Sequence, residues 1–173
     1  FIPVFHIAER GYGTGLNMLT TWAAWEQSGQ VLPLRFTSFE AFPMAPDDMT
    51  RALQAFPELS DWRDRFLAVW DGSKADLGTL NLEVLQGDAR MTLPVWREKV
   101  DAWFLDGFSP AKNPELWGSD LMNAVAQHTK PGGSVATYAA AGFVRRGLEA
   151  AGFAVARAPG FGRKRHMTRA VLV

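Results

Sequence analysis

Short apolar runs alternate with longer amphipathic segments along most of the chain. The apolar runs predict buried strands at residues 4–8, 34–39, 82–85, 102–105 and 134–138. The segments between them predict helices at residues 16–27, 47–56, 60–69, 92–98, 117–128 and 143–151. Such alternation indicates βαβ units, in which a parallel sheet carries helices on both faces.

The carboxyl-terminal runs break this alternation. Residues 153–157 and 167–173 predict two further strands with no helix between them, so they should pair as an antiparallel hairpin at one edge of the sheet. The sequence therefore predicts one α/β domain over residues 1–173, built on a mostly parallel, seven-stranded, Rossmann-like sheet. The chain starts at Phe1, inside a strand pattern, and we expect it to be part of a longer protein.

Composition narrows the possible chemistry. The 173 residues include no cysteine, which excludes disulfides, thiolate catalysis and thiolate metal sites. His6, His128 and His166 lie far apart in the sequence, and we expect no metal site. No apolar run approaches the roughly 18 residues of a membrane span, and no signal peptide is visible. We therefore expect a cytoplasmic protein with no membrane partner.

Charge is unevenly distributed, although the 18 basic and 18 acidic residues cancel. Residues 1–86 hold 6 Lys and Arg against 11 Asp and Glu. Residues 130–173 hold 8 basic residues and a single acid, Glu149. The carboxyl-terminal third is therefore a candidate surface for an anionic partner, although solvated surface charge explains short basic runs equally well.

A glycine-rich turn follows the first predicted strand. Residues 9–15 read Glu-Arg-Gly-Tyr-Gly-Thr-Gly, and these glycines would let a ligand approach the backbone where the next helix begins. The G-x-G-x-x-G dinucleotide fingerprint fails, because Leu16 or Met18 stands where its last glycine is required. A nicotinamide-dependent oxidoreductase is therefore disfavoured, and an ordinary turn without a ligand is the simplest alternative.

Acidic residues follow the first three predicted strands. Glu40 is placed to accept hydrogen bonds from ribose hydroxyls, and Asp88 to accept one from an adenine amino group. Ligands of open α/β sheets bind beyond the carboxyl ends of the strands, where Glu9, Glu40 and Asp88 all fall. A helix cap or a solvated strand end explains each acid alone. Their coincidence favours a nucleoside site.

Five runs of residues carry a more specific likeness: 11–17, 39–43, 100–114, 141–147 and 160–165. The third run contains the segment Asp-Gly-Phe-Ser-Pro-Ala-Lys-Asn-Pro, which starts at Asp106. In this order, over nearly the whole chain, the five runs resemble the methyltransferase domain of the MnmC family, within the class I S-adenosylmethionine-dependent methyltransferase superfamily. The resemblance implies S-adenosylmethionine as cofactor and tRNA as partner. It also implies methyl transfer to the amine of 5-aminomethyl-2-thiouridine at the wobble position. Members commonly carry an FAD-dependent oxidase domain as well, so FAD is expected only if the parent protein has that fusion.

Candidate roles can also be given to single residues. Cofactor binding is expected of Glu9, Gly11, Gly13, Gly15, Asn17, Glu40, Asp88 and Ala89. Asp106 would accept the amine proton, while Phe108 and Trp117 would stack on the extruded base or exclude water. The tRNA would be contacted by Lys112, Arg145, Arg146, Arg163, Lys164 and Arg165. No special role is predicted for Arg10 and Tyr12.

Two other functions are compatible with these motifs. A small-amine transferase of the spermidine synthase type shares the glycine turn and an aspartate after the fourth strand, but needs no basic surface. A nucleoside-binding domain without catalysis would keep the turn, although retention of Asp106 and its whole following segment speaks against it. A proline-rich loop that ends in a helix cap is the structural alternative for that segment.

Overall fold

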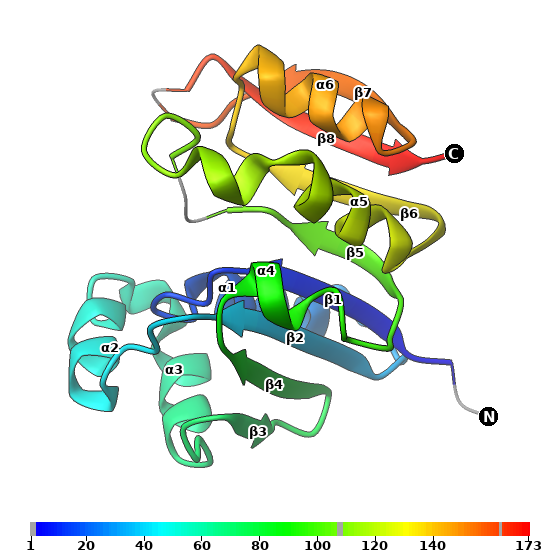
Figure 1. Cartoon of the computed structure of the whole chain (residues 1–173). Helices are drawn as coiled ribbons and strands as arrows, with labels where there is room; N and C mark the ends of the chain where they lie inside the picture. The colour runs from blue at the N-terminus through cyan, green and yellow to red at the C-terminus, as the bar shows by residue number, and fades with distance from the viewer. Residues whose placement is uncertain (1–2, 107–108, 163) are drawn as a thin grey trace.

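One sheet of eight strands runs through the middle of the molecule (Figure 1), in the order β3-β4-β2-β1-β5-β6-β8-β7. The structure, a computed structural model, describes residues 3–106, 109–162 and 164–173. Five of its strands are parallel: β1 (Phe5–Arg10), β2 (Leu34–Glu40), β4 (Leu80–Gln86), β5 (Val100–Phe104) and β6 (Thr129–Thr137). We call the side on which these strands end the carboxyl edge.

Antiparallel strands flank this parallel centre. β8 (His166–Leu172) pairs with β6 and with β7 (Phe153–Pro159), antiparallel to both, so the predicted carboxyl-terminal hairpin and the mostly parallel α/β sheet are confirmed. At the other edge, β3 (Lys74–Asp76) adds an eighth strand beside β4. Three residues are too few to show an apolar pattern, which is why the sequence predicts only seven strands.

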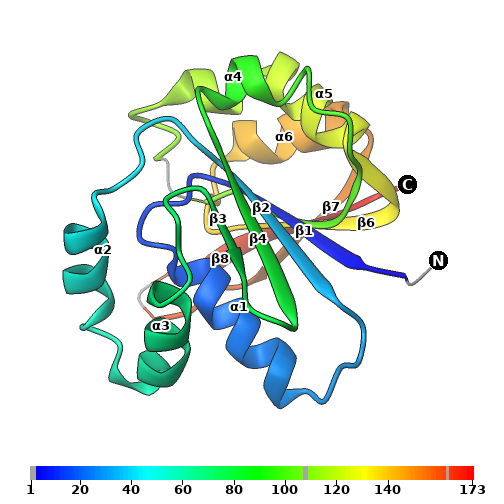
Figure 2. The same cartoon turned by 90° about the horizontal axis from the view of Figure 1, so that it is seen from below.

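Helices cover both faces of the sheet, as Figure 2 shows. One face carries α1 (Leu16–Gln27), α2 (Pro46–Leu53) and α3 (Ser60–Leu67), with the short 3-10 segment η1 (Pro57–Leu59). The other carries α4 (Ala89–Thr92), α5 (Ser119–Gln127) and α6 (Gly142–Ala150), with the 3-10 segment η2 (Pro114–Trp117). Each face therefore has its own apolar core.

The two cores divide the buried aromatic residues between them. Trp22 and Phe66 bury their rings under α1 and α3 against the β2–β4 side of the sheet. Trp103 packs with Val125 and Leu148 under α5 and α6. Burying large apolar side chains on both faces fixes the strand register, because a shift of one residue would turn each of them to the wrong side.

Three local predictions differ from the structure. In place of the helix expected at 92–98, the structure has the shorter and earlier α4. Asp88 accepts a hydrogen bond from the backbone N–H of Arg90, so the helix starts at Ala89. Pro94 follows its end. The helix expected from Trp117 starts at Ser119, after η2. The Pro-Gly-Gly sequence of residues 131–133 predicts a turn, but these residues lie within β6, as a bulge between the pairs Val100–Thr129 and Ala102–Ser134.

Candidate active site

Three glycines shape the turn between β1 and α1. Gly11, Gly13 and Gly15 have φ angles of 90°, 53° and 78°, in the left-handed region that favours glycine. A Cβ atom at Gly15 would lie only 2.7 Å from the hydroxyl oxygen of the buried Tyr12. The glycines therefore let the chain pass tightly over the end of β1 before α1 begins.

Glu9 lies at the end of β1 and is only 1% exposed. Its Oε1 accepts a hydrogen bond from Nδ2 of Asn17 at 2.8 Å, and its Oε2 accepts one from Oγ of Ser38 at 3.0 Å. Burial, with smaller contributions from the carboxyls of Asp106 and Glu40, raises the pKa of Glu9 to about 8 against the opposing effect of these hydrogen bonds. A buried acid that titrates near neutrality is suited to receive a cation.

Glu40 ends β2 and holds the glycine turn in place. Its Oε2 accepts the backbone N–H of Gly13 at 3.0 Å, and its Oε1 accepts that of Phe42 at 2.9 Å. A carboxylate has about four lone-pair sites, so each oxygen can still accept a further hydrogen bond, such as one from a hydroxyl group. The turn and the candidate ribose acceptor therefore form one hydrogen-bonded unit.

Asp88 is engaged by its own helix. It accepts the backbone N–H of Arg90 at 2.9 Å and pairs with the Arg90 guanidinium at 2.5 Å, and these hydrogen bonds lower the pKa of Asp88. Asp88 and Ala89 nevertheless line a cavity of about 160 Å³ together with Glu40 and Phe42. We call this the β2–β4 cavity. It lies where a flat base beside Glu40 would fit.

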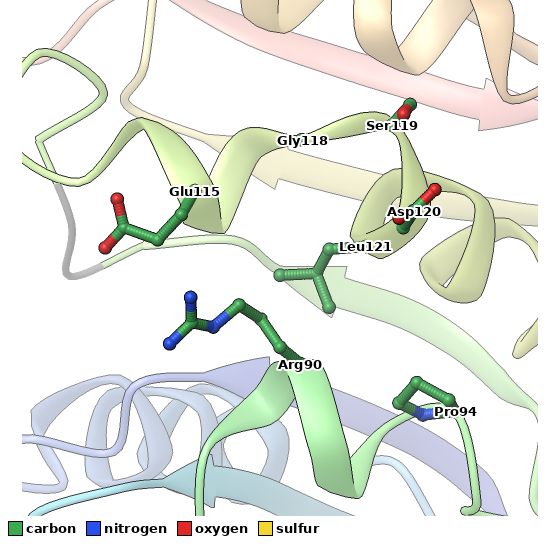
Figure 3. A pocket seen from close by; sticks show the side chains of 7 residues that line it. All are labelled: Arg90, Pro94, Glu115, Gly118, Ser119, Asp120 and Leu121. Carbon is green, nitrogen blue, oxygen red and sulfur yellow. The ribbon is translucent and has the colours of Figure 1, made fainter.

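A separate cavity of about 260 Å³ lies between α4 and the start of α5. Figure 3 shows Arg90 reaching from α4 toward Glu115 of η2, with Leu121 between the two elements. Both Arg90 and Glu115 also line the β2–β4 cavity. Arg90 therefore forms part of the wall between the two cavities while it neutralises Asp88.

Asp106 follows β5 at the carboxyl edge and is partly buried. Its Oδ1 accepts the backbone N–H of Tyr138 at 3.2 Å. Burial raises the pKa of Asp106, while hydrogen bonds from Tyr138 and Asn17 act against the rise. Asn17, Asp106, Tyr138 and Lys164 line one cavity of about 450 Å³, which we call the Asp106 cavity. The structure thus brings the glycine-turn helix, the acid after β5 and the β7–β8 hairpin together.

Arg10, for which no role is predicted, is buried next to this site. Its guanidinium carbon lies 4.4 Å from the centre of the Trp117 ring, and its Nη1 donates to the carbonyl oxygen of Leu116. Its Nε and Nη2 have no partner among the described residues. Trp117 is only 3% exposed, so we withdraw it from the residues expected to stack on a base. Its ring holds η2 against β1 instead.

The remaining predicted residues fall into three groups. Lys112, Arg146, Lys164 and Arg165 are exposed, whereas Arg145 is half-buried on α6. Lys164, on the hairpin between β7 and β8, lines a cavity with Asp106, and Arg165 follows it in the same connection. Phe108 and Arg163 lie outside the described residues.

The side chains at the carboxyl edge fit a cationic nucleoside ligand. Glu9 suits a positive charge, Glu40 retains lone pairs for hydroxyl groups, and the β2–β4 cavity suits a flat base. A mostly parallel sheet with this glycine turn and these acids defines a Rossmann-like methyltransferase that uses S-adenosylmethionine.

The chain belongs to the S-adenosyl-L-methionine-dependent methyltransferase family, whose model matches residues 56–173. Its structure is similar to that of MNMC2 from Aquifex aeolicus, with a TM-score of 0.81, 28% identity, and coverage of 98% of this chain and 53% of that one. The predicted resemblance to the methyltransferase domain of MnmC is thereby confirmed. The chain spans about half the length of that Aquifex protein.

Two less similar structures share the fold. TrmN from Thermus thermophilus has a TM-score of 0.59 at 17% identity, covering 99% of this chain and 45% of its own. S-adenosylmethionine-bound CalS10, an amino pentose methyltransferase from Micromonospora echinaspora, has a TM-score of 0.58 at 15% identity, covering 98% of this chain and 84% of its own. The fold predicted from the sequence is therefore confirmed, and membership of the S-adenosyl-L-methionine-dependent methyltransferase family confirms the predicted cofactor class.

Within residues 3–106, 109–162 and 164–173, no helix combines the length and apolar character needed to cross a membrane. In the same part of the chain, no group of three or more His, Cys, Asp or Glu side chains is arranged to hold a metal ion.

Proposed function

We propose that this chain transfers a methyl group from S-adenosylmethionine to the amine of 5-aminomethyl-2-thiouridine at the wobble position of tRNA. The observation that carries the proposal is the Asp106 cavity, which places a partly buried carboxylate between the glycine turn and a basic hairpin. The likeness to MNMC2 from Aquifex aeolicus supports the choice of substrate. A small-amine substrate would leave the basic hairpin without a function.

The cofactor-binding residues divide by the part of the ligand they would hold. Glu40 accepts hydrogen bonds from the ribose hydroxyls with its remaining lone pairs. The β2–β4 cavity, which Asp88 and Ala89 line, holds the adenine. Glu9, held by Asn17, faces the positively charged methionine end. The glycines of the turn keep the backbone clear of the ligand. The bound cofactor supplies a methyl group that is already activated by its sulfonium.

Asp106 acts on the amine. A free alkylamine has a pKa of roughly 10, so it arrives protonated and has no lone pair for attack. Desolvation in the Asp106 cavity lowers the pKa of the amine, and the carboxylate of Asp106 accepts its proton. As the new N–C bond forms and the S–C bond breaks, Asp106 holds the amine in line and passes the proton to solvent. Burial raises the pKa of Asp106, which makes it a better proton acceptor.

Transfer of a labelled methyl group to tRNA that carries 5-aminomethyl-2-thiouridine tests the proposal directly. Asp106→Asn keeps the shape of the side chain and removes its basicity, so we expect a loss of turnover of at least about 100-fold. Calorimetric binding of S-adenosylmethionine should remain within about threefold of the wild type, which shows that the variant folds. Methylation of a free polyamine, with none of tRNA, would favour the spermidine synthase alternative. A turnover loss below about tenfold would remove Asp106 from the mechanism.

A further inference from the structure

A second hollow of about 400 Å³ adjoins the Asp106 cavity and has two exposed aromatic side chains in its wall. Tyr138 follows β6 and is 45% exposed, and Phe143 in the first turn of α6 is 42% exposed. Lys164, Arg165 and His166 also line it. We call this hollow the aromatic shelf. Its volume lies within the roughly 300–1,000 Å³ typical of ligand sites.

The aromatic shelf is continuous with the Asp106 cavity. Ser109, Pro110, Tyr138, Ala139 and Lys164 line both. A hydrogen bond also joins the two hollows, from the backbone N–H of Tyr138 to Oδ1 of Asp106. Figure 1 shows the residues from 109 to η2, the start of α6 and the end of β7 on one side of the molecule. A ligand on the shelf therefore lies next to whatever reacts at Asp106.

Charge and aromatic surface occur together on the shelf. The Lys164 ammonium lies 6.0 Å from the centre of the Tyr138 ring. Among the described residues, neither Lys164 nor Arg165 forms an ion pair with a carboxylate. An aromatic face beside cations that form no ion pair with a carboxylate matches a nucleotide, whose base stacks on the ring while its phosphate meets the cation.

We propose that the aromatic shelf binds one unpaired nucleotide adjacent to the uridine that reacts at Asp106, with its base stacked on Tyr138 and its phosphate on Lys164 and Arg165. This inference rests on the proposed tRNA methyl transfer. A base that stacks there anchors the strand on one side of the target, so the target uridine can leave its own stack and enter the Asp106 cavity. Phe143 lines the same hollow and adds a second exposed aromatic side chain.

Two variants of one residue test the proposal. Tyr138→Leu removes the aromatic face and keeps an apolar side chain, whereas Tyr138→Phe keeps the ring. With an anticodon stem–loop that carries 5-aminomethyl-2-thiouridine, we expect Tyr138→Leu to raise KM about five- to 100-fold while kcat changes little. Tyr138→Phe should remain near the wild type. Val31→Ala, at a 93% exposed position before β2, is the matched surface control.

A binding assay separates failure of the shelf from failure of the proposed function. A five-nucleotide single-stranded RNA is titrated against wild type and Tyr138→Leu, with no methyl transfer required. Binding that is lost in Tyr138→Leu supports the shelf even if wild-type protein methylates no tRNA. A wild-type KM and wild-type RNA affinity in Tyr138→Leu would overturn the shelf, even if tRNA methylation is intact. A pentamer that binds neither protein would also overturn it.

Discussion

The guanidinium carbon of Arg10 lies 4.4 Å above the Trp117 ring and joins the end of β1 to η2. Neighbouring side chains of a strand point to opposite faces of the sheet, so Glu9 and Arg10 serve different halves of the site. Glu9 accepts a hydrogen bond from Asn17 of α1. Arg10 instead donates one to Leu116 of η2, which comes after Asp106 in the chain. One strand end thus supports both the cofactor side and the catalytic side.

Arg10→Met should loosen η2 without unfolding the protein. Methionine fills most of the same volume, and removal of a buried cation with two nitrogens that lack a partner among the described residues offsets the lost contacts. We expect the thermal midpoint to shift by no more than about 4 °C. Amide hydrogen exchange at Leu116 and Trp117 should become at least about tenfold faster, and methyl transfer should fall. Unchanged exchange there would show that Arg10 does not hold the segment.

Glu9 should couple cofactor binding to proton release. Its pKa is about 8 in the folded chain against an ordinary value of 4.5, so the folded state binds one proton more than the unfolded state between these pH values. Its contribution to stability therefore falls as pH rises from about 4.5 to 8. A cation beside Glu9 favours its ionised form, so S-adenosylmethionine affinity should rise from pH 6 to 8, by up to about tenfold per unit.

Calorimetry at pH 7 in two buffers of different ionisation enthalpy measures the proton release. Glu9→Gln cannot ionise, so it should bind more weakly, release no proton and show a flat pH profile. It should also be more stable than the wild type at pH 8, where ionised Glu9 is costly to bury. A wild-type enthalpy that is independent of the buffer would contradict the coupling.

Glu40 and Asp88 should differ in their effect on cofactor affinity. Glu40→Ala removes the acceptor that holds Gly13 and the candidate ribose contact, so we expect about 10- to 100-fold weaker binding of S-adenosylmethionine. Asp88 already pairs with Arg90, so Asp88→Ala should cost less than about tenfold, together with a small loss of stability from the missing cap. Equal losses in calorimetric titrations would mean that Asp88 contacts the ligand as directly as Glu40.

The β7–β8 hairpin should account for part of the salt dependence of tRNA binding. Reversing the charges of Lys164 and Arg165 to Glu removes two candidate phosphate contacts. The slope of log affinity against log salt should become shallower by about 2. Lys99→Glu is the control, because the exposed Lys99 precedes β5 at the opposite edge of the sheet. An unchanged slope in the double variant would exclude the hairpin from the interface.

The sequence predicts most of the architecture because the parallel strands are buried and therefore read as apolar runs. The same patterns place Glu9, Glu40 and Asp106 at strand ends, and parallel strands bring those ends to one edge. β3 escapes prediction because it is short and exposed on alternate residues. The helix expected at 92–98 fails because a side-chain cap at Asp88, rather than apolar periodicity, decides where α4 begins.

The site residues that the sequence misses owe their positions to contacts between distant segments. Arg10 and Leu116 are 106 residues apart, and nothing near either one indicates the contact. Trp117 lies in a proline-rich segment, which favours an exposed aromatic residue over a buried partner for a cation. The sequence around Tyr138 does not show that Lys164, on the β7–β8 hairpin, lies close to its ring. The register of the last two strands sets that contact, and apolar patterning leaves it open.

Strand direction gives the β7–β8 hairpin a further consequence. β8 is antiparallel to β6, so the connection between β7 and β8 emerges at the carboxyl edge without any helix to constrain its length. Insertions there would extend a loop at the border of the sheet and leave the glycine turn, three strands away, untouched. Under the proposed function, the choice of nucleic acid can therefore diverge in evolution by changes to one connection, while the residues that hold the methyl donor are inherited unchanged.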